Sequence, residues 1–229
     1  MSEEITGATL YIVPTPIGNL EDITYRAVKI LAGVDLIAAE DTRTTKVLLD
    51  AYKIQRPLMS FFSQNESVRV PQILGRLKEG LSVALVSDAG TPGISDPAYS
   101  IITACIGEGI RIVPLPGPTA FVPVLVASGF PTHSFAFEGF LPHKKGRATK
   151  LGELKDEART IVLYESPHRI LKTLDDLKNA LGDREAVVGR EMTKKFEEIL
   201  RGSLSSIHAT LCAKAIKGEF VIVLAGSQS

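Results

Sequence analysis

The sequence is poor in cysteine and carries no net charge, and both shortages narrow the possible functions. Cys105 and Cys212, the only two cysteines, fall in predicted helices far apart in the chain, so they supply neither a disulfide framework nor the spacing of a metal site. The 26 basic and 26 acidic side chains cancel. The chain therefore has no overall field that attracts nucleic acid, and any polyanion must be bound through local contacts.

Long apolar runs and metal-ligand spacings are missing as well. The longest strongly apolar run, residues 121–127, is far too short to span a bilayer, and the start of the chain has Glu3 and Glu4 instead of a basic segment with an apolar core. The four histidines share no spacing typical of a zinc site, so we expect no metal. These observations predict a cytoplasmic globular protein without a membrane partner.

Familiar nucleotide and hydrolase motifs are also absent. No Gly-x-Ser-x-Gly elbow anchors a hydrolase triad. Residues 13–20 follow a predicted strand as a glycine-rich loop would, but they carry prolines where a dinucleotide fold has glycines, and no Walker lysine follows. A P-loop nucleotide hydrolase is thereby excluded. The chemistry expected is binding of a small molecule by loops, with little covalent help.

The loop at residues 87–97 is the strongest candidate for a ligand site. It reads Ser-Asp-Ala-Gly-Thr-Pro-Gly-Ile-Ser-Asp-Pro and follows an apolar run at 83–86 that predicts a buried strand. Apolar residues then recur at helical spacing over 98–106. Open α/β sheets bind ligands at the carboxyl ends of their strands, where this loop lies. The alternative is an ordinary connection, for which the loop is long.

Individual residues of this loop have chemistry suited to binding. Gly90 and Gly93 tolerate positive φ and let a ligand approach the backbone, and Asp88 offers an acceptor for hydroxyl or amino groups. Asp96 followed by Pro97 predicts an N-cap and the first residue of the next helix. We therefore expect free backbone amides where the loop ends.

The first half of the chain alternates strands and helices, which predicts a parallel sheet with its ligand loops on one edge. Its second strand ends in Glu40, Asp41, Thr42 and Arg43, an unusual concentration of charge, although acidic residues also favour the first turn of a helix. The predicted strands of this half are residues 10–13, 34–39, 57–62, 83–86 and 110–115.

The best candidate for a hinge between two domains is the run Pro116-Gly117-Pro118, which ends a predicted strand abruptly. It predicts two α/β domains, residues 1–116 and residues 117–229. Ser166 and Pro167 predict the cap and the first position of a helix in the second domain. The densest basic segment, residues 141–150, suggests a flexible loop that contacts phosphates, or a merely solvated surface. Other predicted elements are strands 134–138, 160–164, 185–189 and 219–224, and helices 170–181 and 204–213.

Six ordered motifs together resemble the tetrapyrrole methylase superfamily, and within it the group that methylates the 2'-oxygen of a cytidine in small-subunit (16S) ribosomal RNA. These motifs are residues 13–20, 39–43, 87–97, 115–118, 164–169 and 190–198. The resemblance implies two α/β domains with S-adenosylmethionine in the cleft between them, a homodimer, and 16S rRNA or the small ribosomal subunit as substrate. Members usually continue into a small helical C-terminal domain, which this sequence lacks.

The resemblance also implies roles for individual residues. Glu40 and Asp41 are the first candidates for a base, ahead of Glu165 and Glu191. The implied cofactor-binding residues are Pro14, Pro16, Asp88, Gly90, Thr91, Ile94, Ser95, Thr119, Ala120, Tyr164, Glu165 and Val223. The expected RNA-binding residues are Arg43, Lys144, Lys145, Arg147, Arg169, Lys194 and Lys195.

Two alternative functions stay open at this point. A methylase acting on a tetrapyrrole would share the fold and cofactor, but the charged motifs at residues 40–43 and 190–195 argue against it. A regulatory module would bind S-adenosylmethionine without transferring its methyl group. Transfer of the methyl group to a precorrin, or binding without any transfer, would distinguish them.

Overall fold

A computed structural model describes residues 5–227 and divides the chain into two compact units. Unit 1 ends at Thr119 and unit 2 begins at Ala120, slightly beyond the hinge expected at residue 116. Each unit contains its own sheet and its own apolar core. No helix within residues 5–227 is long and apolar enough to cross a membrane.

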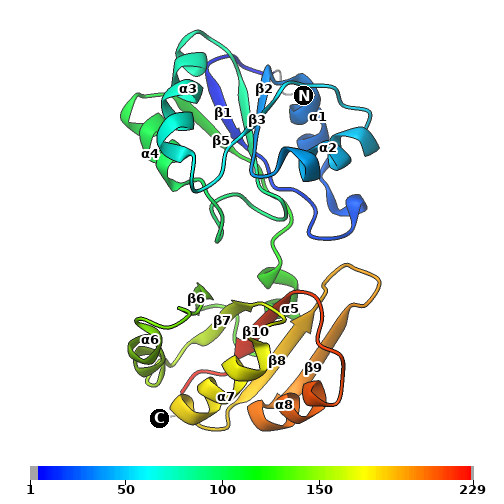
Figure 1. The fold of residues 1–229 in the computed structure, drawn as a ribbon, viewed down its shortest axis with the longest axis vertical. Coiled ribbons are helices and arrows are strands. Elements are labelled where there is room, and N and C mark those ends of the chain that lie inside the picture. The colour runs from blue at the N-terminus through cyan, green and yellow to red at the C-terminus, as the bar shows by residue number, and fades with distance from the viewer. Residues whose placement is uncertain (1–4, 228–229) are drawn as a thin grey trace. The chain divides into compact units, whose positions relative to one another are not determined.

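Unit 1 contains a five-stranded parallel sheet in the order β3-β2-β4-β1-β5 (Figure 1). All four strand pairings are parallel, which confirms the prediction from strand and helix alternation. All of these strands therefore end at one edge. The strands are β1 (Thr9–Ile12), β2 (Leu36–Ala39), β3 (Leu58–Ser60), β4 (Val83–Val86) and β5 (Arg111–Pro114).

Helices cover both faces of this sheet (Figure 1). Along β1, Tyr11 packs with α1 and α2, whereas Leu10 and Ile12 pack with α3 and α4, because successive side chains of a strand point to opposite faces. Burial on both faces explains why the strands read as continuous apolar runs. The helices are α1 (Tyr25–Gly33), α2 (Thr42–Ala51), α3 (Glu66–Lys78) and α4 (Tyr99–Gly107), with a 3-10 turn η1 (Leu20–Asp22) before α1.

The first helix of unit 1 has a regular N-cap, whereas α4 begins later than the sequence predicts. Thr24 caps α1 by accepting a hydrogen bond from the backbone N–H of Ala27. The prediction that Asp96 and Pro97 begin the next helix is wrong, because α4 begins at Tyr99. Asp96 is partly buried, and its carboxylate is hydrogen-bonded to the side chain of Ser87 within the loop before the helix.

Unit 2 contains a mixed five-stranded sheet in the order β6-β7-β10-β8-β9. Within the unit 2 sheet, the β6–β7 pair is parallel and the other pairs between described strands are antiparallel. The sequence did not predict β9, an edge strand that contains polar and charged residues and a glycine. The strands are β6 (Phe135–Phe140), β7 (Thr160–Glu165), β8 (Glu185–Arg190), β9 (Glu198–Ser203) and β10 (Phe220–Leu224).

One face of the unit 2 sheet packs against α6, α7 and α8 around a large apolar core, and α5 packs against the other face. Ser166 is not the cap of α7: its carbonyl accepts from the N–H groups of Arg169 and Ile170, so a turn precedes the helix. The basic segment predicted as a flexible loop ends in a helix. The helices are α5 (Phe121–Ala127), α6 (Arg147–Leu154), α7 (Ile170–Leu181) and α8 (Leu204–Cys212).

Candidate functional site

The loops that follow β1, β2, β4 and β5 meet at the carboxyl edge of the unit 1 sheet. We call residues 13–17, 40–41, 87–97 and 115–119 the loop edge. Thr15 joins two of these loops, since its backbone pairs with that of Gly90 and its hydroxyl donates to the carbonyl of Ser87 at 3.0 Å. Parallel strands place their ligand loops at such an edge.

A second set of contacts joins the β4 loop to the β5 loop. The Thr91 hydroxyl donates to the carbonyl of Pro118 at 2.9 Å and lies 2.7 Å from the hydroxyl of Thr119. Pro14 lies so close to Gly117 that a Cβ added there would be 2.5 Å from the Cβ of Pro14. The loops that follow β1, β4 and β5 therefore contact one another and form one connected surface.

The backbone of the β4 loop turns repeatedly through the left-handed region. Gly90 and Gly93 have φ of 86° and 88°, which confirms the prediction that their freedom is needed. Ser95 adopts φ of 69°, an uncommon value for a residue with a side chain. Ile94 is half-buried between them and donates its N–H to the carbonyl of Thr91. The loop is thus shaped by its own hydrogen bonds.

Three carboxylates, Glu40, Asp88 and Asp96, form an acidic group at the loop edge. The backbone N–H of Asp88 donates to Oε2 of Glu40 at 3.3 Å. Burial, with the Glu40 charge as the next cause, raises the pKa of Asp96 to about 7. Burial also raises the pKa of Glu40 and of Asp88, and neighbouring carboxylates add to both shifts. This region therefore favours either a proton or a cationic ligand.

Asp41 has the opposite environment from Glu40, although the two are adjacent in sequence. Hydrogen bonds from the Arg43 side chain and backbone lower the pKa of Asp41 to about 2. Its carboxylate also caps α2, and its own N–H donates to Asp88 at 2.9 Å. Asp41 is therefore a poor proton acceptor at neutral pH, whereas Glu40 is better suited to that task.

The expected cofactor residues of unit 2 have different surroundings. Tyr164 is half-buried in a cluster of rings, with the Phe137 ring centroid at 5.2 Å and that of Phe140 at 5.6 Å. Ala120 precedes α5. Val223 is fully buried in the central strand β10, so its side chain offers no surface to a ligand.

Glu165, which the resemblance expects to contact the cofactor, lies in a buried polar network. Its side chain is 0% exposed and accepts from Arg169 at 2.9 Å and from the Thr173 hydroxyl at 2.6 Å. Arg147 joins the network through Thr173 at 2.8 Å and through an ion pair with Asp176 at 2.8 Å. Arg147 is therefore buried and paired, not free for RNA as the sequence suggested.

This network holds the basic segment at the end of β6. Arg169 donates to the carbonyl of Leu141, and Arg147 donates to the carbonyl of Pro142. Between these anchors, Lys144 and Lys145 are exposed. Arg147 and Arg169, which the sequence predicts to contact RNA, therefore support the segment that carries the exposed Lys144 and Lys145.

The other predicted RNA-binding residues fall into two classes. Lys194 is bound to Glu191 and Glu219 at 2.9 Å each, whereas Lys195 is exposed. Arg43, in unit 1, is exposed but paired with Asp41 at 2.6 Å. Only Lys195 in this set therefore offers an unpaired positive charge.

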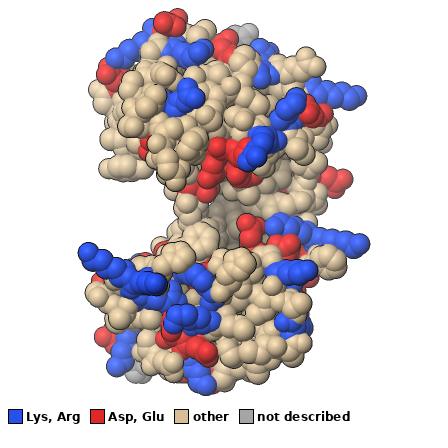
Figure 2. All heavy atoms as spheres, in the orientation of Figure 1, with Lys and Arg blue, Asp and Glu red and all other residues tan. Residues whose placement is uncertain are grey.

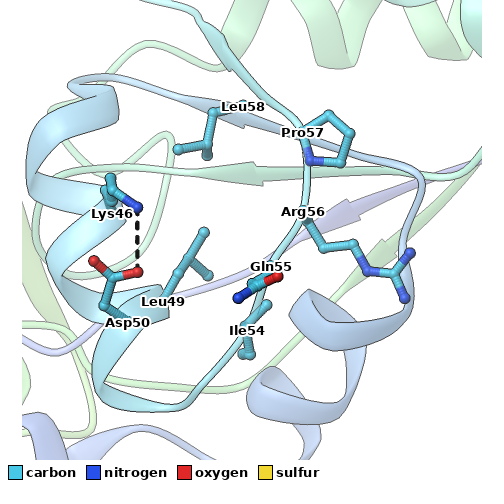
Figure 3. A pocket seen from close by; sticks show the side chains of 8 residues that line it. All are labelled: Lys46, Leu49, Asp50, Ile54, Gln55, Arg56, Pro57 and Leu58. Atoms are coloured by element: carbon cyan, nitrogen blue, oxygen red, sulfur yellow. Dashed lines mark hydrogen bonds and ion pairs between the residues drawn. The ribbon is translucent and has the colours of Figure 1, made fainter.

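A surface pocket of about 370 Å³ lies on unit 1, away from the loop edge (Figure 3). The segment that leads into β3 forms part of its wall, so the pocket lies toward the amino ends of the strands. Lys46 pairs with Asp50 at 3.3 Å there, and Arg56 extends away to donate to the carbonyl of Ala32. We assign it no catalytic role. Its lining residues are Lys46, Leu49, Asp50, Ile54, Gln55, Arg56, Pro57 and Leu58.

Sequence reasoning missed two parts of the site. Thr15 stands between Pro14 and Pro16, which are both buried and were both predicted as site residues. The role of Thr15 is visible only in its hydrogen bond to the carbonyl of Ser87 in another loop. Asp96 was interpreted as a helix cap. Its position beside Glu40 depends on the folding of two separate loops. Within the described residues, no group of His, Cys, Asp and Glu has the geometry of a metal site.

Comparisons with known proteins place this geometry in context. The profile for Tetrapyrrole (Corrin/Porphyrin) Methylases matches residues 9–208. A protein named Ribosomal RNA small subunit methyltransferase I from Thermotoga maritima is 51% identical over 219 residues, 96% of this chain and 99% of that protein. Proteins with the same name from Bacillus subtilis (strain 168) and Escherichia coli O157:H7 are 47% and 46% identical, over 96% of this chain in both cases and 76% and 78% of their own lengths.

Solved structures with the same fold are more distant in sequence. A cobalt precorrin-4 methyltransferase has a TM-score of 0.72 at 20% identity, covering 95% of each chain. The uroporphyrin-III C-methyl transferase of Thermus thermophilus, complexed with S-adenosyl homocysteine, has a TM-score of 0.66 at 18% identity, covering 94% of this chain and 96% of that one. Likeness at these identities concerns the fold alone.

Proposed function

The chain belongs to the tetrapyrrole (corrin/porphyrin) methylase family, and on that basis we propose that it transfers a methyl group from S-adenosylmethionine to the 2'-oxygen of a cytidine in 16S ribosomal RNA. The observation that carries this proposal is the identity of about half of all residues, over nearly the whole chain, with proteins named Ribosomal RNA small subunit methyltransferase I. The distant precorrin and uroporphyrin enzymes share only the fold.

The loop edge fits S-adenosylmethionine by its chemistry. When bound, the cofactor supplies an electrophilic methyl group on a positively charged sulfur. Glu40, Asp88 and Asp96 present carboxylates whose pKa values are raised by burial and by one another, and a cationic ligand relieves that repulsion. The close approach of Pro14 to Gly117 leaves room only for a glycine, which keeps the backbone of two loops accessible.

Several residues of the loop edge hold the cofactor in this proposal. Asp88 accepts hydrogen bonds from its polar groups, and the turns around Gly90 bring backbone groups toward it. The remaining unit 1 contacts are Pro14, Pro16, Thr91, Ile94, Ser95 and Thr119. The resemblance adds Ala120 and Tyr164 from unit 2.

Glu40 is the residue that we propose as the base. A ribose hydroxyl is a poor nucleophile, and a positioned carboxylate that accepts its proton makes the oxygen more reactive. The raised pKa of Glu40 brings that carboxylate nearer to the working pH than a free glutamate. Asp41, with its pKa held at about 2, orders the start of α2 and supports Glu40 instead. Alignment of the reacting atoms supplies much of the remaining acceleration.

We also propose a homodimer that works in the cytoplasm, where small ribosomal subunits are assembled. Tyr99 and Ile106 on α4 are 82% and 67% exposed and lie seven residues apart, hence on one face of the helix. This apolar face is a candidate contact between copies. Sedimentation velocity of the native protein and of Ile106→Glu tests it, since a monomeric native protein would contradict the proposal.

Transfer of a labelled methyl group tests the function directly. The protein is incubated with tritiated S-adenosylmethionine and either small subunits from cells lacking this modification or a precorrin. We expect label in ribosomal RNA and none in the precorrin. Label in the precorrin alone indicates a tetrapyrrole methylase, and cofactor binding without any transfer indicates a regulatory module.

A further inference from the structure

The carboxyl ends of β6, β7 and β8 lie at one edge of the unit 2 sheet, beside the start of β10. The register shows this: Phe140 pairs with Tyr164, and Phe220 pairs with both Glu165 and Arg190. Residues 141–146, 191–197 and 214–219 extend from this edge. We call these three segments the basic edge. Figure 2 shows basic side chains on several parts of the visible face of unit 2, with acidic ones among them.

Positive charges on the basic edge are divided between paired and unpaired groups. Lys194 is bound by Glu191 and Glu219, and Glu198 binds Lys214 and lies 3.7 Å from Arg190. These pairs use the nearby carboxylates except that of Glu197, which accepts from a backbone N–H. On the basic edge, the exposed lysines for which the described residues show no ion pair are Lys144, Lys145, Lys195 and Lys217. The edge therefore carries an uncompensated positive charge although the whole chain is neutral.

The loop between β8 and β9 is braced from within (Figure 1, orange). Oε1 of Glu191 accepts from the backbone N–H of Glu219 at 3.0 Å and from Nζ of Lys194 at 2.9 Å. Oε2 of Glu197 accepts from the backbone N–H of Thr193 at 2.6 Å. A Cβ at Gly218 would lie 2.3 Å from Glu191, so a glycine is required beneath the loop. These contacts fix the loop and its tip.

The tip of this braced loop presents an aromatic ring to solvent. Phe196 is 68% exposed, and the ammonium of Lys195 lies 5.8 Å from the centre of its ring. The exposed ring has a face on which another planar group can stack. A planar ring beside Lys195, with three further unpaired lysines on the same sheet edge, matches the chemistry that proteins use for single-stranded nucleic acid, with bases stacked on rings and phosphates held by cations.

We propose that the basic edge binds a single-stranded segment of RNA, with Phe196 stacked on an unpaired base and Lys144, Lys145, Lys195 and Lys217 in contact with phosphates. The proposal rests on the proposed function for the identity of the nucleic acid, and it assigns a surface and a stacking residue that the function alone does not name. A protein partner on this surface is disfavoured, because one isolated ring among lysines provides little apolar area.

Binding of an unstructured RNA of twelve nucleotides with a central 2-aminopurine tests the stacking. The fluorescence of 2-aminopurine is quenched when the base stacks. Phe196→Tyr keeps a planar ring and is expected to retain both affinity and quenching. Phe196→Leu keeps apolar bulk without a ring, and we expect it to lose the quenching and at least about fivefold in affinity, the lower end for one stacked base. Equal quenching by Phe196→Leu and the native protein would overturn the proposal.

Salt dependence tests the phosphate contacts independently. Each contact with single-stranded RNA contributes about 0.7 to the slope of log affinity against log salt, so Lys144→Ala with Lys145→Ala is expected to lower that slope by roughly 1.4. Lys155→Ala with Lys178→Ala is the matched control, because both lysines are exposed away from the basic edge, Lys155 directly after the last residue of α6 and Lys178 in the last turn of α7. An equal loss of slope in the control pair would contradict the assignment.

The two proposals fail in different ways. If the protein methylates small subunits but Phe196→Leu binds RNA as the native protein does, the proposed function is supported and the proposed RNA-binding surface is contradicted. Loss of a dimer in sedimentation velocity on Phe196→Ala would assign the ring to a subunit contact and also overturn the proposal. RNA binding that depends on Phe196, without methyl transfer to any acceptor, would support the surface and contradict the function.

Discussion

Thr15 and Gly90 exchange two backbone hydrogen bonds, the N–H of each bonded to the carbonyl oxygen of the other at 2.8 and 2.9 Å. Thr15 follows β1 and Gly90 follows β4, so this pairing extends the contact between the two strands beyond the sheet itself. The Thr15 hydroxyl adds a bond to the buried Ser87. The loop that follows β4 is thereby held in place by a residue of the loop that follows β1.

Thr15→Val removes that hydroxyl while keeping the shape of the side chain. The buried carbonyl of Ser87 then loses a partner, so we expect a loss of about 1–3 kcal/mol in the free energy of unfolding and weaker S-adenosylmethionine binding. Urea denaturation and isothermal titration calorimetry measure the two effects. Thr103→Val, at an exposed position of α4, is the matched control. Equal behaviour of both variants would remove Thr15 from the site.

Glu40→Gln is expected to lower kcat at least a hundredfold while S-adenosylmethionine binding persists, because a general base contributes about that much or more. In the native protein, activity should rise with pH through the raised pKa of Glu40, since only the carboxylate accepts a proton. Asp41→Ala should lower the melting temperature through its lost helix cap and reduce kcat much less. A larger kcat loss for Asp41→Ala than for Glu40→Gln would reverse the assignment.

Asp96→Asn tests the electrostatics of the acidic group through the pH dependence of stability. The pKa of Asp96 rises from 3.8 to about 7 on folding, so the folded protein binds more protons than the unfolded chain between these values. Native stability should therefore fall as pH rises from about 4 to 7, relative to the variant, and the difference should level off above 7. Melting curves across this range measure it, and a constant difference would show that Asp96 titrates normally.

The raised pKa of Asp96 also predicts how the binding of S-adenosylmethionine depends on pH. A cationic ligand favours the ionised carboxylate, so affinity of the native protein for S-adenosylmethionine should increase as pH rises through about 7. Calorimetry at several pH values measures the increase. Asp96→Asn should bind more weakly above pH 7 and lose that part of the pH dependence. An unchanged profile would place the positive sulfur away from Asp96.

Glu165→Ala tests whether the buried network of unit 2 is structural. The variant leaves Arg169 without its carboxylate and the buried Thr173 hydroxyl without its acceptor, so we expect a loss of about 3–5 kcal/mol in the free energy of unfolding. Urea denaturation measures this loss. Lys172→Ala removes an exposed partner of Asp176 and should cost less than about 1 kcal/mol. Similar losses for both variants would contradict the network.

Local sequence patterns were sufficient for the parts of the fold that depend on local chemistry. The apolar run at residues 83–86 is β4, and the glycines of the following loop have the positive φ that their type permits. These features depend on neighbours a few residues away, which the sequence displays directly.

The features that were missed depend on distant residues. Arg147 belongs to a basic run, but its burial requires Asp176, which is 29 positions away. Strand β9 is recognisable only through its pairing with β8. Asp96 has a cap-like sequence context, and its shifted pKa arises from burial and from Glu40 in another loop. Tertiary contacts override local propensity in each case.

We propose methylation of a ribose oxygen, and the position of the label in ribosomal RNA shows which atom receives the methyl group. Small subunits labelled with tritiated S-adenosylmethionine are digested with alkali, which cleaves after every nucleotide whose 2'-oxygen is free. We expect the label to survive in a single alkali-resistant dinucleotide that begins with cytidine. Label released in mononucleotides would place the methyl group on a base and contradict ribose methylation.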